Sequence, residues 1–199
     1  MSWKSFRFAL IAAGAAMLAS CGINSVPTKE EAAKAAWANV ESAYQRRADL
    51  IPNLVSTVRG AAAAEEDTLT GVIEARSRAT SIQLSADDLD DPAKFQQFEA
   101  AQGELGSALS RLMVTVERYP ELQSQQRFGD LMVALEGSEN RIETARVRYN
   151  EAVQDYNTTI RTFPDIVGAK VIHGAEPMQT FSAKPGADEA PTVDFGNEG

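Results

Sequence analysis

A seven-residue repeat of large apolar residues is the feature that most restricts what this chain can fold into. The repeat runs through Phe128, Leu135, Ile142, Tyr149, Tyr156 and Phe163. The companion positions are mostly small, namely Leu131, Ser138, Ala145, Ala152 and Thr159. This pattern is typical of a long helix that packs closely against antiparallel neighbours. It predicts a helix of 36 residues from Phe128 to Phe163, about 54 Å long and stopped by Pro164.

Two further segments carry a helical stripe, with apolar residues at alternating spacings of three and four. The first helix is expected from Thr28 to about Glu66, and another from Pro92 to about Arg118. The inward residues of the first are Trp37, Val40, Tyr44, Arg47, Ile51, Leu54, Val58 and Ala61, and those of the second are Phe95, Phe98, Gln102, Leu105, Leu109, Leu112, Val116 and Tyr119. The predicted fold class is therefore all-α, an antiparallel bundle of long helices.

Local signals set the expected ends of these helices. Thr28 followed by Glu31 has the pattern of a capping box. Pro52 lies inside the first helix, where a proline loses a backbone hydrogen bond and clashes with the preceding turn, so we expect a kink or a break near Asp49. Its freed carbonyl would need an amide or an arginine nearby.

The remaining segments are shorter. A helix is expected from Asp67 or Thr68 to about Leu84, followed by an acidic loop at 85–91. Asp91 before Pro92 predicts an N-cap followed by a proline in the first helical position. After Pro164 the stripe disappears, and residues 166–172 read as a short extended segment. Glycine, proline and acids dominate beyond about Lys184, so residues 184–199 are expected to be a disordered acidic tail.

The N-terminus has the pattern of a bacterial lipoprotein signal peptide. Basic residues precede a 12-residue apolar run, Phe8 to Ala19, which is too short to span a bilayer and typical of a signal-peptide core. Small residues then lead to Cys21, the expected site of lipidation. We expect residues 1–20 to be the signal peptide, 21–28 a tether and 29–183 the bundle. The alternative is an uncleaved N-terminal anchor. Gly22 in place of an aspartate favours the outer membrane in hosts that have one.

Composition excludes several functions. Without Lys4 and Arg7, 17 basic residues face 28 acidic ones, a net charge of −11, which argues against nucleic acid or anionic lipid as the main partner. Cys21 is the one cysteine and His173 the one histidine. A disulfide, a cysteine metal site, a histidine pair and a Ser-His triad are therefore not expected. We predict no metal and no cofactor.

Three polar features of the sequence are candidate sites. The loop Asp87–Asp91 has the charge for calcium, but its register puts Ala93 where a calcium loop needs glycine, which favours a solvated loop with a helix cap. Glu139, Asn140 and Arg141 form either a contact point for a partner or an interhelical network with Arg46, Arg47 or Asp49. The interhelical network is preferred. His173 lies in a non-helical segment and has no set of catalytic partners.

Taken together, the motifs resemble the LemA family over roughly residues 36–181. The resemblance rests on Trp37, on the run Arg46 to Val55 with Arg47, Asp49, Pro52, Asn53 and Leu54, on Tyr119-Pro120, on Glu139-Asn140-Arg141, on Tyr149-Asn150 and Tyr156-Asn157, and on Phe163-Pro164. It implies an antiparallel helical bundle outside the cytoplasm behind an N-terminal membrane anchor, with no settled activity. Family members commonly carry a longer transmembrane helix where this chain has a short apolar run.

These observations predict a non-enzymatic, membrane-anchored envelope lipoprotein whose bundle is a scaffold or protein-interaction module for other envelope proteins. The alternative is a self-assembling component that shapes the membrane or signals in the envelope, because tethering raises the effective concentration of the bundle.

Overall fold

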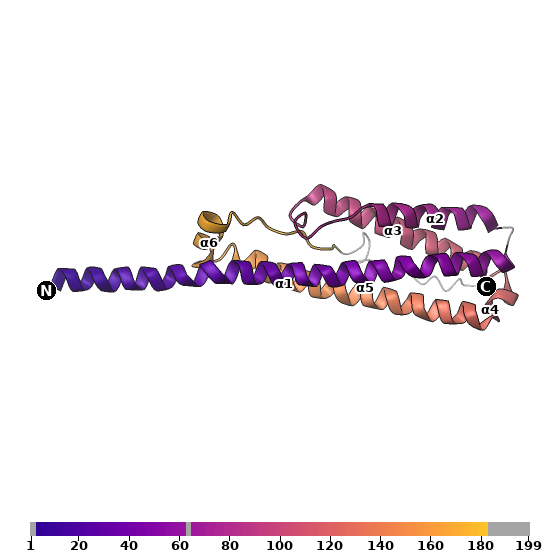
Figure 1. The fold of residues 1–199 in the computed structure, drawn as a ribbon, viewed down its shortest axis with the longest axis horizontal. Coiled ribbons are helices and arrows are strands. Elements are labelled where there is room, and N and C mark those ends of the chain that lie inside the picture. The colour runs from indigo at the N-terminus through magenta and orange to yellow at the C-terminus, as the bar shows by residue number, and fades with distance from the viewer. Residues whose placement is uncertain (1–2, 63–64, 183–199) are drawn as a thin grey trace, which may run out of the picture.

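The computed structural model describes residues 3–62 and 65–182, and for residues 3–23 the account is confined to the backbone. Helix α1 (Trp3–Ala61) runs the length of the molecule, and its N-terminal part extends beyond the bundle (Figure 1). Helix α5 (Gln126–Thr159) lies along it. Helices α2 (Glu66–Ser81) and α3 (Pro92–Val116) pack against each other as a second layer. The predicted all-α antiparallel bundle is confirmed, and no strand occurs among the described residues.

Short elements close the two ends of the bundle. Helix α4 (Pro120–Gln123) connects α3 to α5. At the other end, α6 (Asp165–Gly168) and the π-helical turn η2 (Ala169–His173) lie against α1. None of the helices in the described part of the chain has an apolar stretch long enough to cross a membrane. The predicted tail, residues 184–199, lies outside the described residues.

The first helix differs from the prediction at its start. Its backbone is already helical at Trp3, so residues 21–28, expected to be a tether, are part of α1, and Val26 is fully buried. Thr28 therefore does not cap the helix. Its hydroxyl donates back to the Asn24 carbonyl at 2.6 Å, as happens inside a helix that began upstream.

Pro52 does not break α1, which continues to Ala61 (Figure 1). Ile51 and Leu54 on either side are buried in the core. Their packing offsets the cost of the proline.

The end of the chain differs as well. Helix α5 stops at Thr159 rather than Phe163, and the Phe163 side chain is 72% exposed. Residues 166–172 are helical, in α6 and η2, rather than extended. Turns this short show no stripe, and Gly174, with a positive φ of 57°, ends them.

The core consists of two apolar clusters along the bundle. One joins the first half of the bundled α1 to the C-terminal half of α5 and the segments near both, and it centres on Trp37. The other joins the end of α1 to α2, the C-terminal half of α3 and the start of α5. Along α1 the first cluster ends at Tyr44 and the second begins at Ile51. Arg47 lies between them.

Candidate functional site

A buried polar layer built on Arg47 separates the two clusters. The Arg47 side chain is almost completely buried, and its Nη1 donates to Glu139 Oε1 at 2.8 Å. Its Nη2 donates to Gln102 Oε1 at 2.8 Å and to the Gln102 carbonyl at 3.3 Å. Gln102 Nε2 in turn donates to the Ala79 carbonyl at 3.2 Å. The layer thus joins all four long helices, and the predicted interhelical network is present as an Arg47–Glu139 pair.

The chemistry of this layer is structural. The Arg47 guanidinium lies 5.2 Å from the centre of the Tyr44 ring, and burial raises the pKa of the Tyr44 hydroxyl. Ser138, also buried, donates its hydroxyl to the Leu135 carbonyl at 2.7 Å and is engaged within its own helix. A serine hydroxyl that donates to a backbone carbonyl of its own helix is not activated as a nucleophile.

The carbonyl freed by Pro52 has a partner on another helix. Without an N–H, Pro52 leaves the Ala48 carbonyl without its intrahelical donor. Arg76 Nε of α2 donates to that carbonyl at 2.8 Å. Of the amide or arginine expected in this role, an arginine is present, and the proline becomes a point at which α2 is held to α1.

Residues 175–182, which we call the strap, run along α5 and are held by two asparagines one heptad apart. Asn150 Nδ2 donates to the Phe181 carbonyl at 3.0 Å, and its Oδ1 accepts from the Phe181 N–H at 2.9 Å. Asn157 makes the same pair of bonds to Met178, at 2.9 and 3.0 Å. Each side-chain amide binds the strap as a neighbouring strand would bind it. In both Tyr-Asn motifs the asparagine therefore binds the strap.

The strap also completes the aromatic core. Phe181 packs among Trp37, Phe95 and Tyr149, with ring centres 5.0 to 6.0 Å from its own. Trp37 Nε1 donates to the Leu84 carbonyl at 2.9 Å. The Tyr149 hydroxyl donates to the Gln179 carbonyl at 2.9 Å, and burial raises the pKa of that hydroxyl well above its ordinary value.

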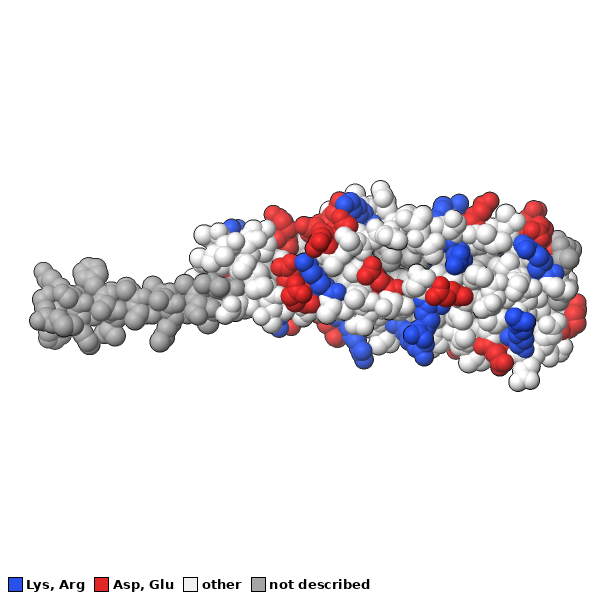
Figure 2. Space-filling model, viewed as in Figure 1, with Lys and Arg blue, Asp and Glu red and all other residues white. Residues whose placement is uncertain are grey.

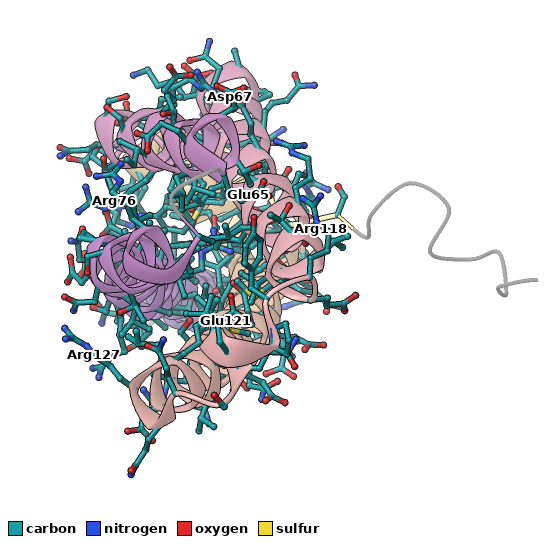
Figure 3. The ribbon with its side chains drawn as sticks, turned by 90° about the vertical axis from the view of Figure 1, so that its right-hand side faces the viewer. Glu65, Asp67, Arg76, Arg118, Glu121 and Arg127 are labelled. Carbon is teal, nitrogen blue, oxygen red and sulfur yellow. The ribbon has the colours of Figure 1, made fainter. Side chains whose placement is uncertain are left out.

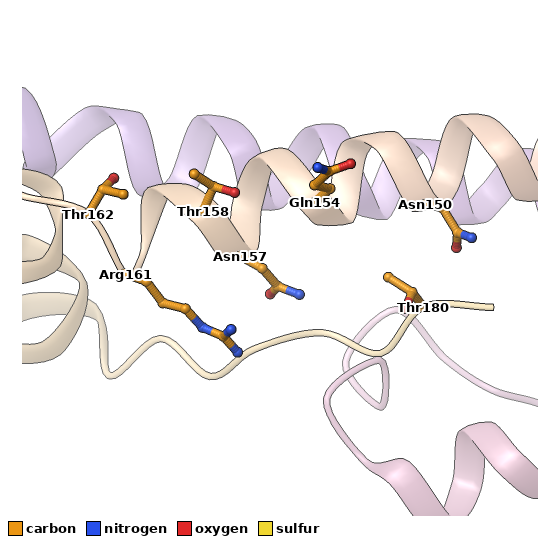
Figure 4. A pocket seen from close by; sticks show the side chains of 7 residues that line it. All are labelled: Asn150, Gln154, Asn157, Thr158, Arg161, Thr162 and Thr180. Atoms are coloured by element: carbon orange, nitrogen blue, oxygen red, sulfur yellow. The ribbon is translucent and has the colours of Figure 1, made fainter. Parts of the chain in front are cut away.

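A polar cleft opens between α5 and the strap (Figure 4). Its volume is about 610 Å³, and it is lined by Asn150, Gln154, Asn157, Thr158, Arg161, Thr162 and Thr180. Two of the lining amides are already bonded to the strap. The lining contains amides, hydroxyls and one guanidinium, so it offers hydrogen bonds but no acid–base pair for catalysis.

The acidic loop is a charged turn that caps α3. Asp91 accepts from the backbone of Ala93 and Lys94 at 2.9 and 3.1 Å, as predicted for an N-cap. Asp88 pairs with Lys94 and with Ser85, and Lys94 is the main cause that lowers the Asp88 pKa to about 2. Asp87 pairs with Lys34 of α1 at 3.2 Å. Among the described residues no cluster of metal-ligating side chains is found.

The far end of the bundle carries a second ionic cluster, seen end-on in Figure 3. Glu65 accepts from Arg118 Nη2 at 3.0 Å and from the Tyr119 hydroxyl at 2.9 Å. Pro120 follows as the first residue of α4. The predicted Tyr119-Pro120 motif therefore joins the turn after α3 to the start of α2.

The structure does not gather the other predicted residues into one site. Leu54 and Tyr156 are core residues. Asp49, Asn53, Asn140 and Arg141 are exposed, and Phe163-Pro164 lie beyond the end of α5. The Cys21 side chain lies outside those described. Sequence reasoning missed Arg76, Glu65 and the strap, although the repeated Tyr-Asn pair seven residues apart was a signal for the last.

Comparison with known proteins finds a matching family and similar proteins. The LemA family profile matches residues 36–195. Magnetosome protein MamQ 1 and MamQ 2 of Paramagnetospirillum magneticum are each 31% identical over 181 residues. Magnetosome protein MamQ of Magnetospirillum gryphiswaldense is 30% identical over 182 residues. Each match covers 83% of this chain and 66% of the relative, so this chain spans slightly less than two thirds of their length.

Proposed function

The chain belongs to the LemA family, and from this premise we propose that it is a membrane-anchored envelope lipoprotein whose bundle is a non-catalytic scaffold for other proteins. The proposal rests on one observation, which is that the buried polar side chains form their hydrogen bonds within the bundle. Arg47 and Gln102 bond to other helices of the bundle, and Ser138 bonds within its own helix. They hold helices in place instead of converging on an open pocket.

Anchoring is supported by the sequence before the bundle. The run from Phe8 to Ala19 followed by Cys21 suits export and lipidation. The N-terminal part of α1 leaves the bundle at one end (Figure 1), so an anchor there leaves the other faces accessible. A mature lipoprotein carries several acyl chains, which anchor stably where a single chain does not.

The surface of the α2–α3 layer suits contact with soluble domains. Charges of both signs are interspersed over the bundle (Figure 2). Ion pairs such as Arg78–Glu104, at 2.7 Å, lie open to solvent on this layer. Such a mixed polar surface stays soluble in water and is compatible with the polar rim of a transient interface.

Photo-crosslinking in intact cells tests the scaffold. A crosslinking amino acid is placed at exposed Glu74 of α2 or Arg111 of α3, with exposed Glu143 of α5 as the matched position on another helix. We expect discrete adducts from α2 and α3 that are lost with Cys21→Ser, because the partner meets the bundle at the membrane. Absence of adducts from every position would contradict the scaffold. So would an enzymatic turnover of the purified chain abolished by one polar substitution.

Self-association is the second candidate. Val133 and Val147, two heptads apart on α5, are 71% and 52% exposed. They share one side of the helix and could meet a second copy. Light scattering of the full chain in detergent decides: an assembly dispersed by Val133→Asp with Val147→Asp supports this candidate, and a monomer at high concentration contradicts it.

A further inference from the structure

Exposed apolar side chains are concentrated in one short segment. Of the eight large apolar residues that are exposed in the described part of the chain, four lie within 163–172. They are Phe163, Val167, Val171 and Ile172, exposed by 72%, 53%, 78% and 57%. Single exposed apolar residues are ordinary, but a cluster of them marks a contact surface. We call residues 163–172 the tip.

The tip is fixed at the end of the bundle from which α1 emerges. The Ser25 hydroxyl of α1 bonds to the Asp165 carboxylate. Gly168 and Ala169 are buried, whereas Val167 and Val171 are exposed. One side of the tip therefore packs on the bundle and the other side faces away. Figure 2 shows that this end of the bundle, beside the grey extension, carries few charged side chains on the face in view.

Under the proposed attachment, the sequence before Ser25 brings the membrane to this end of the bundle. Cys21 precedes Ser25 by four residues, about 6 Å along a helix. If Cys21 carries acyl chains, the bilayer surface begins there. If the apolar run from Phe8 to Ala19 remains as an anchor, the bilayer still lies on the N-terminal side of the tip. The tip thus lies next to the bilayer in either mode of anchoring.

We propose that the tip inserts its apolar side into the membrane interface, as a second contact beside the N-terminal anchor. Burial in the interface removes Phe163, Val171 and Ile172 from water. Lys170 lies between the apolar residues and is exposed, in place to meet headgroup phosphates. The acidic bundle is repelled by anionic lipid, so the contact is chiefly apolar. The inference rests on the proposed membrane attachment and adds an orientation, with the long axis of the bundle directed away from the bilayer.

Depth-dependent fluorescence quenching tests this orientation on the full chain. An environment-sensitive fluorescent amino acid replaces Val171, and Val114 of α3, of similar exposure, is the matched control. The protein is reconstituted in phosphatidylcholine–phosphatidylglycerol vesicles with a nitroxide on the acyl chain near the headgroup. Fluorescence is recorded only from protein that floats with the vesicles. We expect the label at 171 to shift to the blue and lose most of its emission, while the label at 114 keeps the spectrum of a probe in water.

Each other outcome has a distinct meaning. Protein that floats with equal, water-like spectra at both positions overturns the tip contact and leaves the membrane attachment standing. A blue shift at 171 without quenching means that protein, such as a second copy, covers the tip, and it overturns the lipid contact. Protein that does not float at all contradicts the attachment itself, and the tip contact with it.

Discussion

Arg47 determines how the two halves of the core meet. Arg47 is 4% exposed, its guanidinium reaches α3 and α5, and through Gln102 it is linked to α2. A buried ion pair adds little net stability compared with apolar packing, but removing one partner is costly. The layer is therefore better understood as a device that fixes the relative register of the helices.

Two substitutions in this layer should separate the loss of the Arg47 side chain from the loss of the Glu139 charge. Arg47→Ala should lower the free energy of unfolding by about 3 kcal/mol, because it leaves a void and unpaired polar groups on Gln102. Glu139→Gln keeps an acceptor oxygen for Arg47, and because the Glu139 side chain is half-exposed, water screens the charge left on the guanidinium, so the cost should be about 1 kcal/mol or less. Urea denaturation measures both, and equal losses for the two variants would contradict the central role of Arg47.

Pro52 and Arg76 should be coupled energetically. In the native chain, Arg76→Ala removes the donor to the Ala48 carbonyl and should cost about 1 kcal/mol. In a Pro52→Ala background the new N–H at position 52 can donate to that carbonyl, so the same substitution should cost less. A double-mutant cycle in urea measures the coupling, expected to be about 1 kcal/mol. Strictly additive losses would show that the bond to Arg76 does not compensate for the proline.

At the scale of elements, helix α5 and the strap form one unit. The strap is held by two side-chain amides, the Tyr149 hydroxyl and the packing of Phe181 rather than by a sheet. Asn150→Ala with Asn157→Ala should therefore accelerate hydrogen exchange in residues 175–182 and leave the amides of α5 protected. Gln154→Ala, in the same cleft, is the control and should change neither. Loss of protection throughout α5 would show instead that the asparagines support the helix itself.

The elements also show what the sequence could and could not predict. The stripes of α1, α3 and α5 were predictable because a helix that buries one face must repeat apolar residues at its own period. Helices α6 and η2 were not, because a few residues of helix are too short to show a period. The early start of α1 was missed because Thr28 has the type and spacing of a cap, which a hydroxyl bonded within the helix imitates.

The site residues also divide into contacts that the sequence could predict and contacts that it could not. An interhelical network of Glu139–Arg141 with Arg46, Arg47 or Asp49 could be predicted, as could an amide or an arginine at the carbonyl freed by Pro52. The particular partners, Gln102 and Arg76, depend on the register between helices, and sequence patterns within one helix do not contain it. The strap is irregular backbone whose position is set by Phe181 filling a gap between aromatic rings far away in the sequence.

For the whole molecule, these features describe a rod with one end suited to a membrane and the other closed by ion pairs. The N-terminal extension of α1 and the apolar tip lie at one end. Glu65, Arg118 and Tyr119 lie at the other. A rod held at one end keeps its polar sides available, which is what a scaffold in the envelope requires.

Lipidation of Cys21 tests this account most directly. Cells grown with labelled palmitate are fractionated, and the wild type is compared with Cys21→Ser. The account predicts label on the wild-type protein in the membrane fraction and loss of label in the variant. A wild-type protein that carries no label and stays in the soluble fraction would contradict the membrane-anchored scaffold.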